Sequence, residues 1–157
     1  MSNILKFILS LAFPLVIGLL GSYFTLPEID TWYRDIQKPS WNPPNSIFGP
    51  VWTLLYILMG IALYLVWKSG NNNSIKFISI SFFIIQLALN FFWSFIFFNQ
   101  HQTGWAFADI ILLWIFILIT MFSFASVNKT APWLLVPYIS WVSFAMILNY
   151  SIWQLNK

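Results

Sequence analysis

Side chains suited to binding a small molecule recur at helical spacing near the end of this chain. Residues three or four positions apart lie on one face of a helix. One such face carries Tyr138, Trp141, Ala145 and Asn149. The small Ala145 stands between aromatic rings and an amide and leaves room for a flat molecule. This face therefore predicts one wall of an aromatic cavity with few polar contacts, which is typical of small-molecule sites.

Two other stripes would complete such a cavity, although each is also compatible with ordinary helix packing. Trp52 and Tyr56 are four residues apart, but aromatic stripes pack between helices more often than they bind ligands. Asn90 and Trp93 share a stripe with Gln86. Because an unpaired amide within a membrane is costly, hydrogen bonding between helices is about as favoured for these amides as ligand contact.

Small residues also recur at four-residue steps, at Ser10, Pro14, Gly18 and Ser22. Small side chains at this spacing let two helices approach closely. Helix packing is therefore favoured for this stripe over a pocket wall.

The sequence gives little support for acid–base catalysis, metal binding or nucleotide binding. Asp109, one turn after Trp105, is the only acid inside a predicted span, and such a carboxylate is a functional candidate by default. Its place near a helix start favours a structural pairing instead. His101 stands alone in a short loop and is expected to be solvated. The chain has no cysteine, no His/Asp/Glu cluster, no Ser-His-Asp arrangement and no nucleotide-binding glycine motif, so we expect no metal site and no cofactor.

Membrane-spanning helices must position these side chains. Of 157 residues, 60% are hydrophobic and only 7% are charged, whereas a soluble domain carries about 25% charged residues. Five apolar segments each have roughly the 17–25 residues that cross a hydrocarbon core about 30 Å thick. We predict an all-α membrane protein with one domain over residues 1–157. The expected spans are residues 4–24, 50–67, 76–98, 104–125 and 132–155.

One connection is much longer than the others. The polar clusters at 69–74, 99–104 and 126–130 are short turns, which makes the last four spans antiparallel neighbours. The connection over residues 25–49 is long and rich in proline and tryptophan. Structureless loops above about 12–15 residues are uncommon and often serve as lids. We therefore expect this loop to cover an intramembrane pocket.

Several motifs point to a known family. The most specific are WY at 32–33, KPSWNPP at 38–44 and FGPVWTLLY at 48–56, followed by Met59-Gly60. Further matches are Leu89-Asn90 with Trp93, Gly104-Trp105-Ala106 with Asp109, and Pro137-Tyr138 with Trp141, Phe144-Ala145 and Leu148-Asn149. With these residues the chain resembles, over nearly its whole length, the translocator protein family, also known as TspO, tryptophan-rich sensory protein or peripheral benzodiazepine receptor.

The resemblance implies a bundle of five transmembrane helices, often a homodimer, with a ligand cavity closed by the first loop. Such proteins bind porphyrins, especially protoporphyrin IX, and benzodiazepine-site drugs such as isoquinoline carboxamides. By motif position, Trp52 and Trp141 match two pocket tryptophans linked to porphyrin chemistry. Together with Tyr56 from the helical stripe, the other expected ligand-binding residues are Trp32, Tyr33, Asn90, Trp93, Trp105, Ala145 and Leu148.

Two functions from different classes follow from this resemblance. The first is a receptor for tetrapyrroles, transporting them or acting in stress response, in which Lys38 or Arg34 meets the propionates. The second is an enzyme-like, light- and oxygen-dependent degradation of bound protoporphyrin IX, with Trp52 and Trp141 as the catalytic redox partners. Expected partners are a porphyrin or other hydrophobic small molecule, membrane lipid and a second copy of the chain. A net charge of +3 spread over short loops gives no nucleic-acid patch, and a bacterial cytoplasmic membrane is the favoured location.

Overall fold

The chain folds into long helices over the residues that the computed structural model describes, 2–70 and 72–157. Five helical segments are long and apolar enough to cross a membrane, and the described residues contain no strand. This confirms the predicted all-α membrane fold. In chain order the elements are α1 (Asn3–Ile29), α2 (Trp32–Asp35), α3 (Asn45–Lys68), α4 (Asn73–Ser94), the π-helix η1 (Phe95–Asn99), α5 (Thr103–Ala125), the 3-10 helix η2 (Ala131–Leu135) and α6 (Val136–Leu155). Asn71, within the predicted turn at 69–74, lies outside the described residues.

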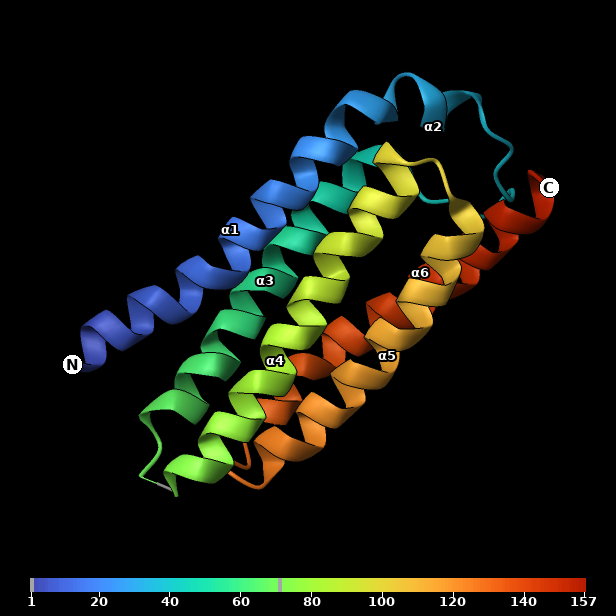
Figure 1. The fold of residues 1–157 in the computed structure, drawn as a ribbon. Helices are drawn as coiled ribbons and strands as arrows, with labels where there is room; N and C mark the ends of the chain where they lie inside the picture. The colour runs from blue at the N-terminus through green and yellow to red at the C-terminus, as the bar shows by residue number, and fades with distance from the viewer. Residues whose placement is uncertain (1, 71) are drawn as a thin grey trace.

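The helices form a bundle whose buried hydrophobic residues make a main core and a second, smaller cluster. Helix α1 packs on α3 and α4, α4 packs on α5, α5 packs on α6, and η2 packs on α3. Phe83 and Phe124 stack at 5.6 Å between ring centroids and bring α4 against α5 in the core. Helix α2, the α4–α5 turn and the C-terminus gather at one end of the bundle, and the N-terminus lies away from that end (Figure 1). We call this end the lid end.

The first connection is shorter than predicted, because helices enter it from both sides. Helix α1 continues to Ile29, and α3 already begins at Asn45. Pro27 does not stop α1 at once, although its ring removes one intrahelical hydrogen bond; the helix ends two residues later, at Ile29. A hydroxyl caps the last turn, since Thr31 Oγ1 donates to the Pro27 carbonyl at 2.9 Å. The connection is therefore residues 30–44, with α2 inside it; we call this segment the lid, after the role expected for it.

Close packing between α1 and α3 depends on glycine. A Cβ added at Gly60 would lie 2.8 Å from the Leu11 Cα and 2.8 Å from the Ser10 carbonyl oxygen. Ser10 and Pro14 are buried in this contact. The interpretation of the small-residue stripe as a packing surface is therefore confirmed.

Candidate functional site

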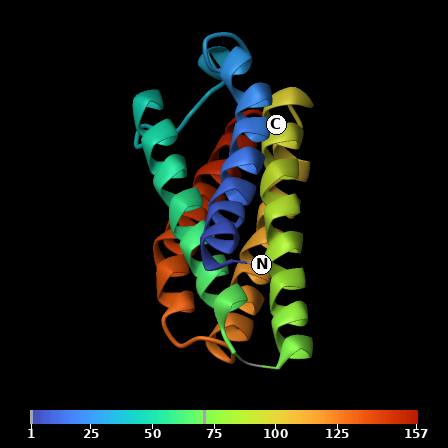
Figure 2. The ribbon, with the colours of Figure 1, turned by 90° about the vertical axis from the view of Figure 1, so that its left-hand side faces the viewer.

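Four aromatic side chains gather between the first half of α3 and the first half of α6. Trp52 stacks on Tyr56 at 5.6 Å and meets Tyr138 edge-on at 6.3 Å. Trp141, one turn after Tyr138, meets Phe48 edge-on at 5.9 Å. We call Trp52, Tyr56, Tyr138 and Trp141 the aromatic site. Figure 2 shows the beginning of α3 standing apart from the other helices beneath the lid connection.

A chain of buried hydrogen bonds fixes one side of the aromatic site. The Tyr56 hydroxyl donates to Asn90 Oδ1 at 2.6 Å, and Asn90 Nδ2 donates to the Tyr138 hydroxyl at 3.1 Å. The Tyr138 hydroxyl in turn donates to Gln86 Oε1 at 2.7 Å. This chain joins α3, α4 and α6, so Asn90 acts as a link between helices. Each ring is thereby held in a defined orientation, as a preformed binding surface requires.

The aromatic site leaves one polar group without a partner. The indole Nε1 of Trp141 is buried and makes no hydrogen bond to any described residue. A buried donor left unpaired costs about 1–3 kcal/mol. This N–H is therefore suited to donate to an acceptor atom of a ligand.

A second group of predicted residues lies between the aromatic site and the lid. Trp93 stacks on Phe97 at 5.2 Å, and its Nε1 donates to Asn149 Oδ1 at 2.9 Å. Tyr33 and Leu148 are buried in the same cluster. Trp93 also packs on the main core, as do Trp52 and Trp141. It thus connects the lid residues to the aromatic site.

The lid is a compact unit held by its own polar contacts. Lys38 Nζ donates to the carbonyls of Tyr33, Arg34 and Ile36. The Tyr33 hydroxyl donates to Asn42 Oδ1 at 3.0 Å, and burial raises the pKa of this phenol. Desolvation lowers the pKa of Lys38. Since its ammonium group already binds three carbonyls, Lys38 stabilises the lid and is not free to bind an anionic ligand.

The other basic residue of the lid is also engaged. Arg34 Nε lies 2.9 Å from Asp35 Oδ1, and both side chains are exposed. A hydrogen bond from Arg34 lowers the pKa of the Asp35 carboxyl. In this conformation the expected role of Lys38 and Arg34 towards propionates therefore has no support from their contacts.

Contacts to α6 hold the lid over the bundle. The Gln37 backbone N–H donates to Asn156 Oδ1 at 3.0 Å, and Asn156 Nδ2 donates back to the Gln37 carbonyl at 2.8 Å. Trp41 meets Phe144 edge-on at 5.9 Å. Phe144 in turn contacts Trp141 at 5.4 Å. The lid is thus joined through aromatic rings to the aromatic site.

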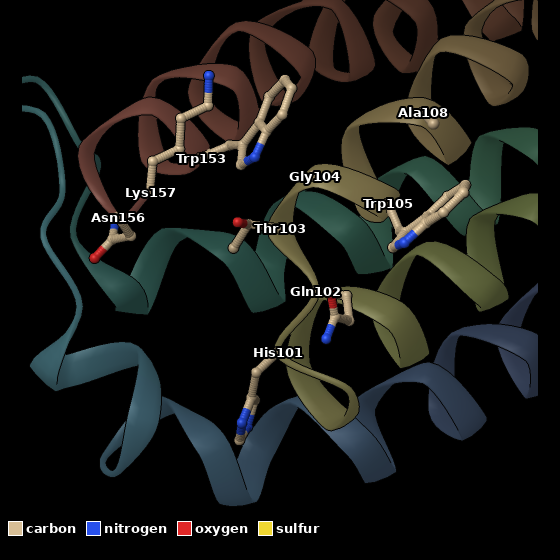
Figure 3. A pocket seen from close by; sticks show the side chains of 9 residues that line it. All are labelled: His101, Gln102, Thr103, Gly104, Trp105, Ala108, Trp153, Asn156 and Lys157. Atoms are coloured by element: carbon tan, nitrogen blue, oxygen red, sulfur yellow. The ribbon is translucent and has the colours of Figure 1, made fainter.

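Trp32 contacts His101, which is exposed to solvent as predicted but does not stand alone. The two rings stack at 4.3 Å between centroids, with 12° between their planes. His101 Nε2 also lies 3.1 Å from Glu28 Oε2. The π-helix η1 ends just before this point, and His101 has a φ of 55°, a left-handed backbone that few residues other than glycine adopt. These features turn the imidazole towards α1 (Figure 3).

Trp105 is separated from the other predicted site residues. Its side chain is 72% exposed and projects from the outer side of α5, away from His101 (Figure 3). Asp109, one turn further along α5, is buried, but its Oδ2 has no hydrogen-bond partner among the described residues. The structural pairing expected for Asp109 is therefore not found there.

Three aromatic residues that were not among the predicted binding residues also shape the site. Phe48 lies one turn before Trp52, and Phe144 lies three residues after Trp141. Tyr138 was recognised on its helical stripe but not as a binding residue, although it connects Trp52 to the hydrogen-bond chain. Helical spacing could have indicated both phenylalanines, because Phe48 stands four residues before Trp52 and Phe144 stands three residues after Trp141.

Comparison with known proteins gives the family. Residues 10–154 match the model of the TspO/MBR family. This chain belongs to the TspO/MBR family. The tryptophan-rich protein TspO of Chlorobaculum tepidum is 46% identical over 154 residues, 98% of each chain. TspO of Archaeoglobus fulgidus is 43% identical over 98% of this chain and 99% of its own. The Homo sapiens translocator protein is 41% identical over 87% of this chain and 81% of its own. This TspO/MBR protein is a multi-pass integral membrane protein.

Proposed function

We propose that this TspO/MBR protein binds flat aromatic molecules at the aromatic site, with porphyrins such as protoporphyrin IX as the ligand class, and serves as a membrane receptor or carrier for tetrapyrroles. Family membership supports a binding or transport role in the membrane. The observation that carries the proposal is the grouping of Trp52, Tyr56, Tyr138 and Trp141 under an anchored lid. Benzodiazepine-site drugs such as isoquinoline carboxamides are also flat and aromatic, so they suit the same surface.

The unpartnered Trp141 indole N–H supports a ligand that carries a hydrogen-bond acceptor. The neighbouring rings supply stacking surfaces, and aromatic pairs contribute about 0.5–1.5 kcal/mol beyond their burial. A porphyrin offers both a broad aromatic face and oxygen acceptors at its edge. Its recognition would then depend on Trp141 and Trp52 more than on the charged residues of the lid.

Titration of the purified protein with protoporphyrin IX in the dark, followed by porphyrin absorbance, tests this proposal. Trp141→Phe keeps an aromatic ring but removes the N–H, and we expect binding to weaken about tenfold, since about 1.4 kcal/mol corresponds to a factor of ten. Trp52→Leu removes a stacking surface and should weaken binding as well. The matched control is Trp133→Phe, because Trp133 is exposed on η2, at the end of the bundle away from the lid. Equal porphyrin affinity in the wild type and in all three variants would refute the assignment of the aromatic site as the porphyrin-binding site.

A second candidate function is light- and oxygen-dependent degradation of the bound porphyrin, with dioxygen as the oxidant. The stacking of Trp52 on Tyr56 and its contact with Tyr138 favour it, because adjacent rings can share an oxidising equivalent. Illumination of the complex in air should then give a new absorbing product. Trp52→Phe and Trp141→Phe should lose conversion beyond their loss of binding. Unchanged conversion per bound porphyrin would remove the tryptophans from the mechanism.

A further inference from the structure

Two hollows on the outer surface of α5 meet at Trp105. The larger, with a volume of about 560 Å³, opens beside the α4–α5 turn and the end of α6 (Figure 3). The smaller, about 420 Å³, runs along α5 and η1 and is lined mainly by apolar atoms. We call the smaller one the Asp109 groove. Its other lining residues are Ile96, Gln100, Gln102, Trp105, Ala108 and Leu112.

Asp109 gives this groove an unusual chemistry. The side chain is 9% exposed, and its buried Oδ2 has no hydrogen-bond partner in the described residues. The salt bridges among residues 2–70 and 72–157 join Arg34 to Asp35 and His101 to Glu28, so neither reaches Asp109. A carboxyl group removed from water without a partner is costly. Asp109 therefore lines the groove with a carboxyl group that the protein itself leaves unmatched.

We propose that the Asp109 groove binds a lipid-soluble amine, whose ammonium group donates to the Asp109 carboxylate while its apolar body lies along Ile96 and Leu112. The argument is charge complementarity, because none of the residues lining the groove is basic. An ammonium group beside Trp105 would also gain from the indole face. Leu112 and Trp105 are exposed on the membrane-facing surface, so the ligand can enter from the lipid.

The larger hollow is a poor competitor for such a ligand. Lys157 and His101 line it, and Lys157 Nζ lies 4.4 Å from the centre of the Trp153 ring. A second cation would meet repulsion from this lysine. The two hollows therefore differ in the charge that they accept, although they share Gln102, Trp105 and Ala108.

The Asp109 groove shares no lining residue with the aromatic site, so the amine proposal does not rest on the porphyrin proposal. In this proposal Trp105 still contributes to binding, but from its position on the outer surface of α5. An amine and a porphyrin should consequently bind without competing.

The test uses the full chain in nanodiscs of uncharged phosphatidylcholine and a long-chain primary amine that carries a dansyl group at its far end. We expect saturable binding, weakened at least tenfold by Asp109→Asn, which keeps the shape of the side chain and removes its charge. Asp35→Asn is the matched control, because Asp35 is an exposed acid of the lid, and it should leave affinity unchanged. A dansyl alcohol of equal length should bind weakly, and equally to the wild type and to Asp109→Asn.

Ala108→Phe provides a second variant in case Asp109→Asn loses its helical circular dichroism. Ala108 is exposed and lines the groove, so a phenyl ring there fills the space without entering the core. Its amine affinity should also fall at least tenfold. Wild-type affinity in either folded variant, or no saturable binding to the wild type, would overturn the proposal.

Discussion

The contact between Gly18 of α1 and the ring of Tyr56 of α3 offers a direct test of how the aromatic site is held. A Cβ added at Gly18 would lie 2.4 Å from Tyr56 Cε2 and 2.6 Å from Cδ2. The ring cannot move freely, because it stacks on Trp52 and its hydroxyl is bonded to Asn90. Overpacking of this kind costs about 1–3 kcal/mol, and loss of the buried hydrogen bond would add about 1–3 kcal/mol. We therefore expect Gly18→Ala to lower the free energy of unfolding by at least about 1 kcal/mol.

The free energy of unfolding can be measured by titrating mixed detergent micelles with dodecyl sulfate and following helical circular dichroism. Gly49→Ala is the matched control, since a Cβ there meets no atom within 4 Å. Gly49 lies in α3, so its replacement should be neutral or stabilise by up to about 1 kcal/mol through helix propensity. Gly18→Ala should also weaken porphyrin binding, because the Tyr56 ring must shift.

A double-mutant cycle tests whether the effect passes through Tyr56. Tyr56→Leu removes the ring atoms that the new methyl group would meet, so Gly18→Ala should cost much less in that background. If Gly18→Ala and Gly49→Ala had the same free energy of unfolding, the proposed contact would not constrain the site.

Three further predictions concern the polar contacts. Tyr138→Phe leaves Gln86 Oε1 without its donor and should destabilise the fold by about 1–3 kcal/mol in the same unfolding assay; a value near zero would mean that the amides find other partners. His101→Gly is compatible with the φ of 55° but removes the imidazole ring that stacks on Trp32. Hydrogen exchange of the α2 amides should therefore become faster. Gln100→Ala, at an exposed neighbouring position, is the control and should leave this exchange unchanged. Burial raises the pKa of Tyr33 above its ordinary value, so its neutral form stabilises the closed lid below about pH 10, and this contribution is lost as the pH rises through the raised value. Absorbance at the tyrosinate band should then lose a late alkaline phase in Tyr33→Phe, and an unchanged titration would contradict this.

The number and length of the spans could be predicted because hydrophobic runs report directly on bilayer crossing. The helix faces around Trp52, Tyr56 and Asn90 were also predictable, since aromatic and amide side chains contrast with the aliphatic residues around them. The end of α1 was not predictable, because proline occurs both in loops and within helices, and residue type alone does not tell the two apart. The hydrogen bond from Thr31 to the Pro27 carbonyl is a contact of the folded chain that no local pattern displays.

The rotation of a helix about its axis is harder to predict in a membrane. Both the inner and the outer face of α5 are apolar, so residue type did not reveal that Trp105 lies outside while Asp109 is buried beside it. The run from Phe91 to Phe98 has the same problem, because apolar residues stand on both sides of Ser94, where α4 changes to η1. That change turns the following loop and brings His101 to Trp32.

The contacts of the lid indicate which of its parts move together. Lys38 and the bond from Tyr33 to Asn42 lie within the lid and would move with it. The contacts that attach the lid to the bundle are of two kinds: the exposed hydrogen bonds between Gln37 and Asn156 and the buried packing of Tyr33 on Phe97 and Phe98. Each such hydrogen bond contributes only about 0.5–1.5 kcal/mol net, so opening the lid as a unit requires mainly that Tyr33 leaves this aromatic cluster while the internal bonds of the lid persist. Hydrogen exchange in His101→Gly tests whether the internal and the attaching contacts of the lid behave separately. Backbone amides of the residues that attach the lid should exchange faster together with those of α2, and the other amides of the lid should not.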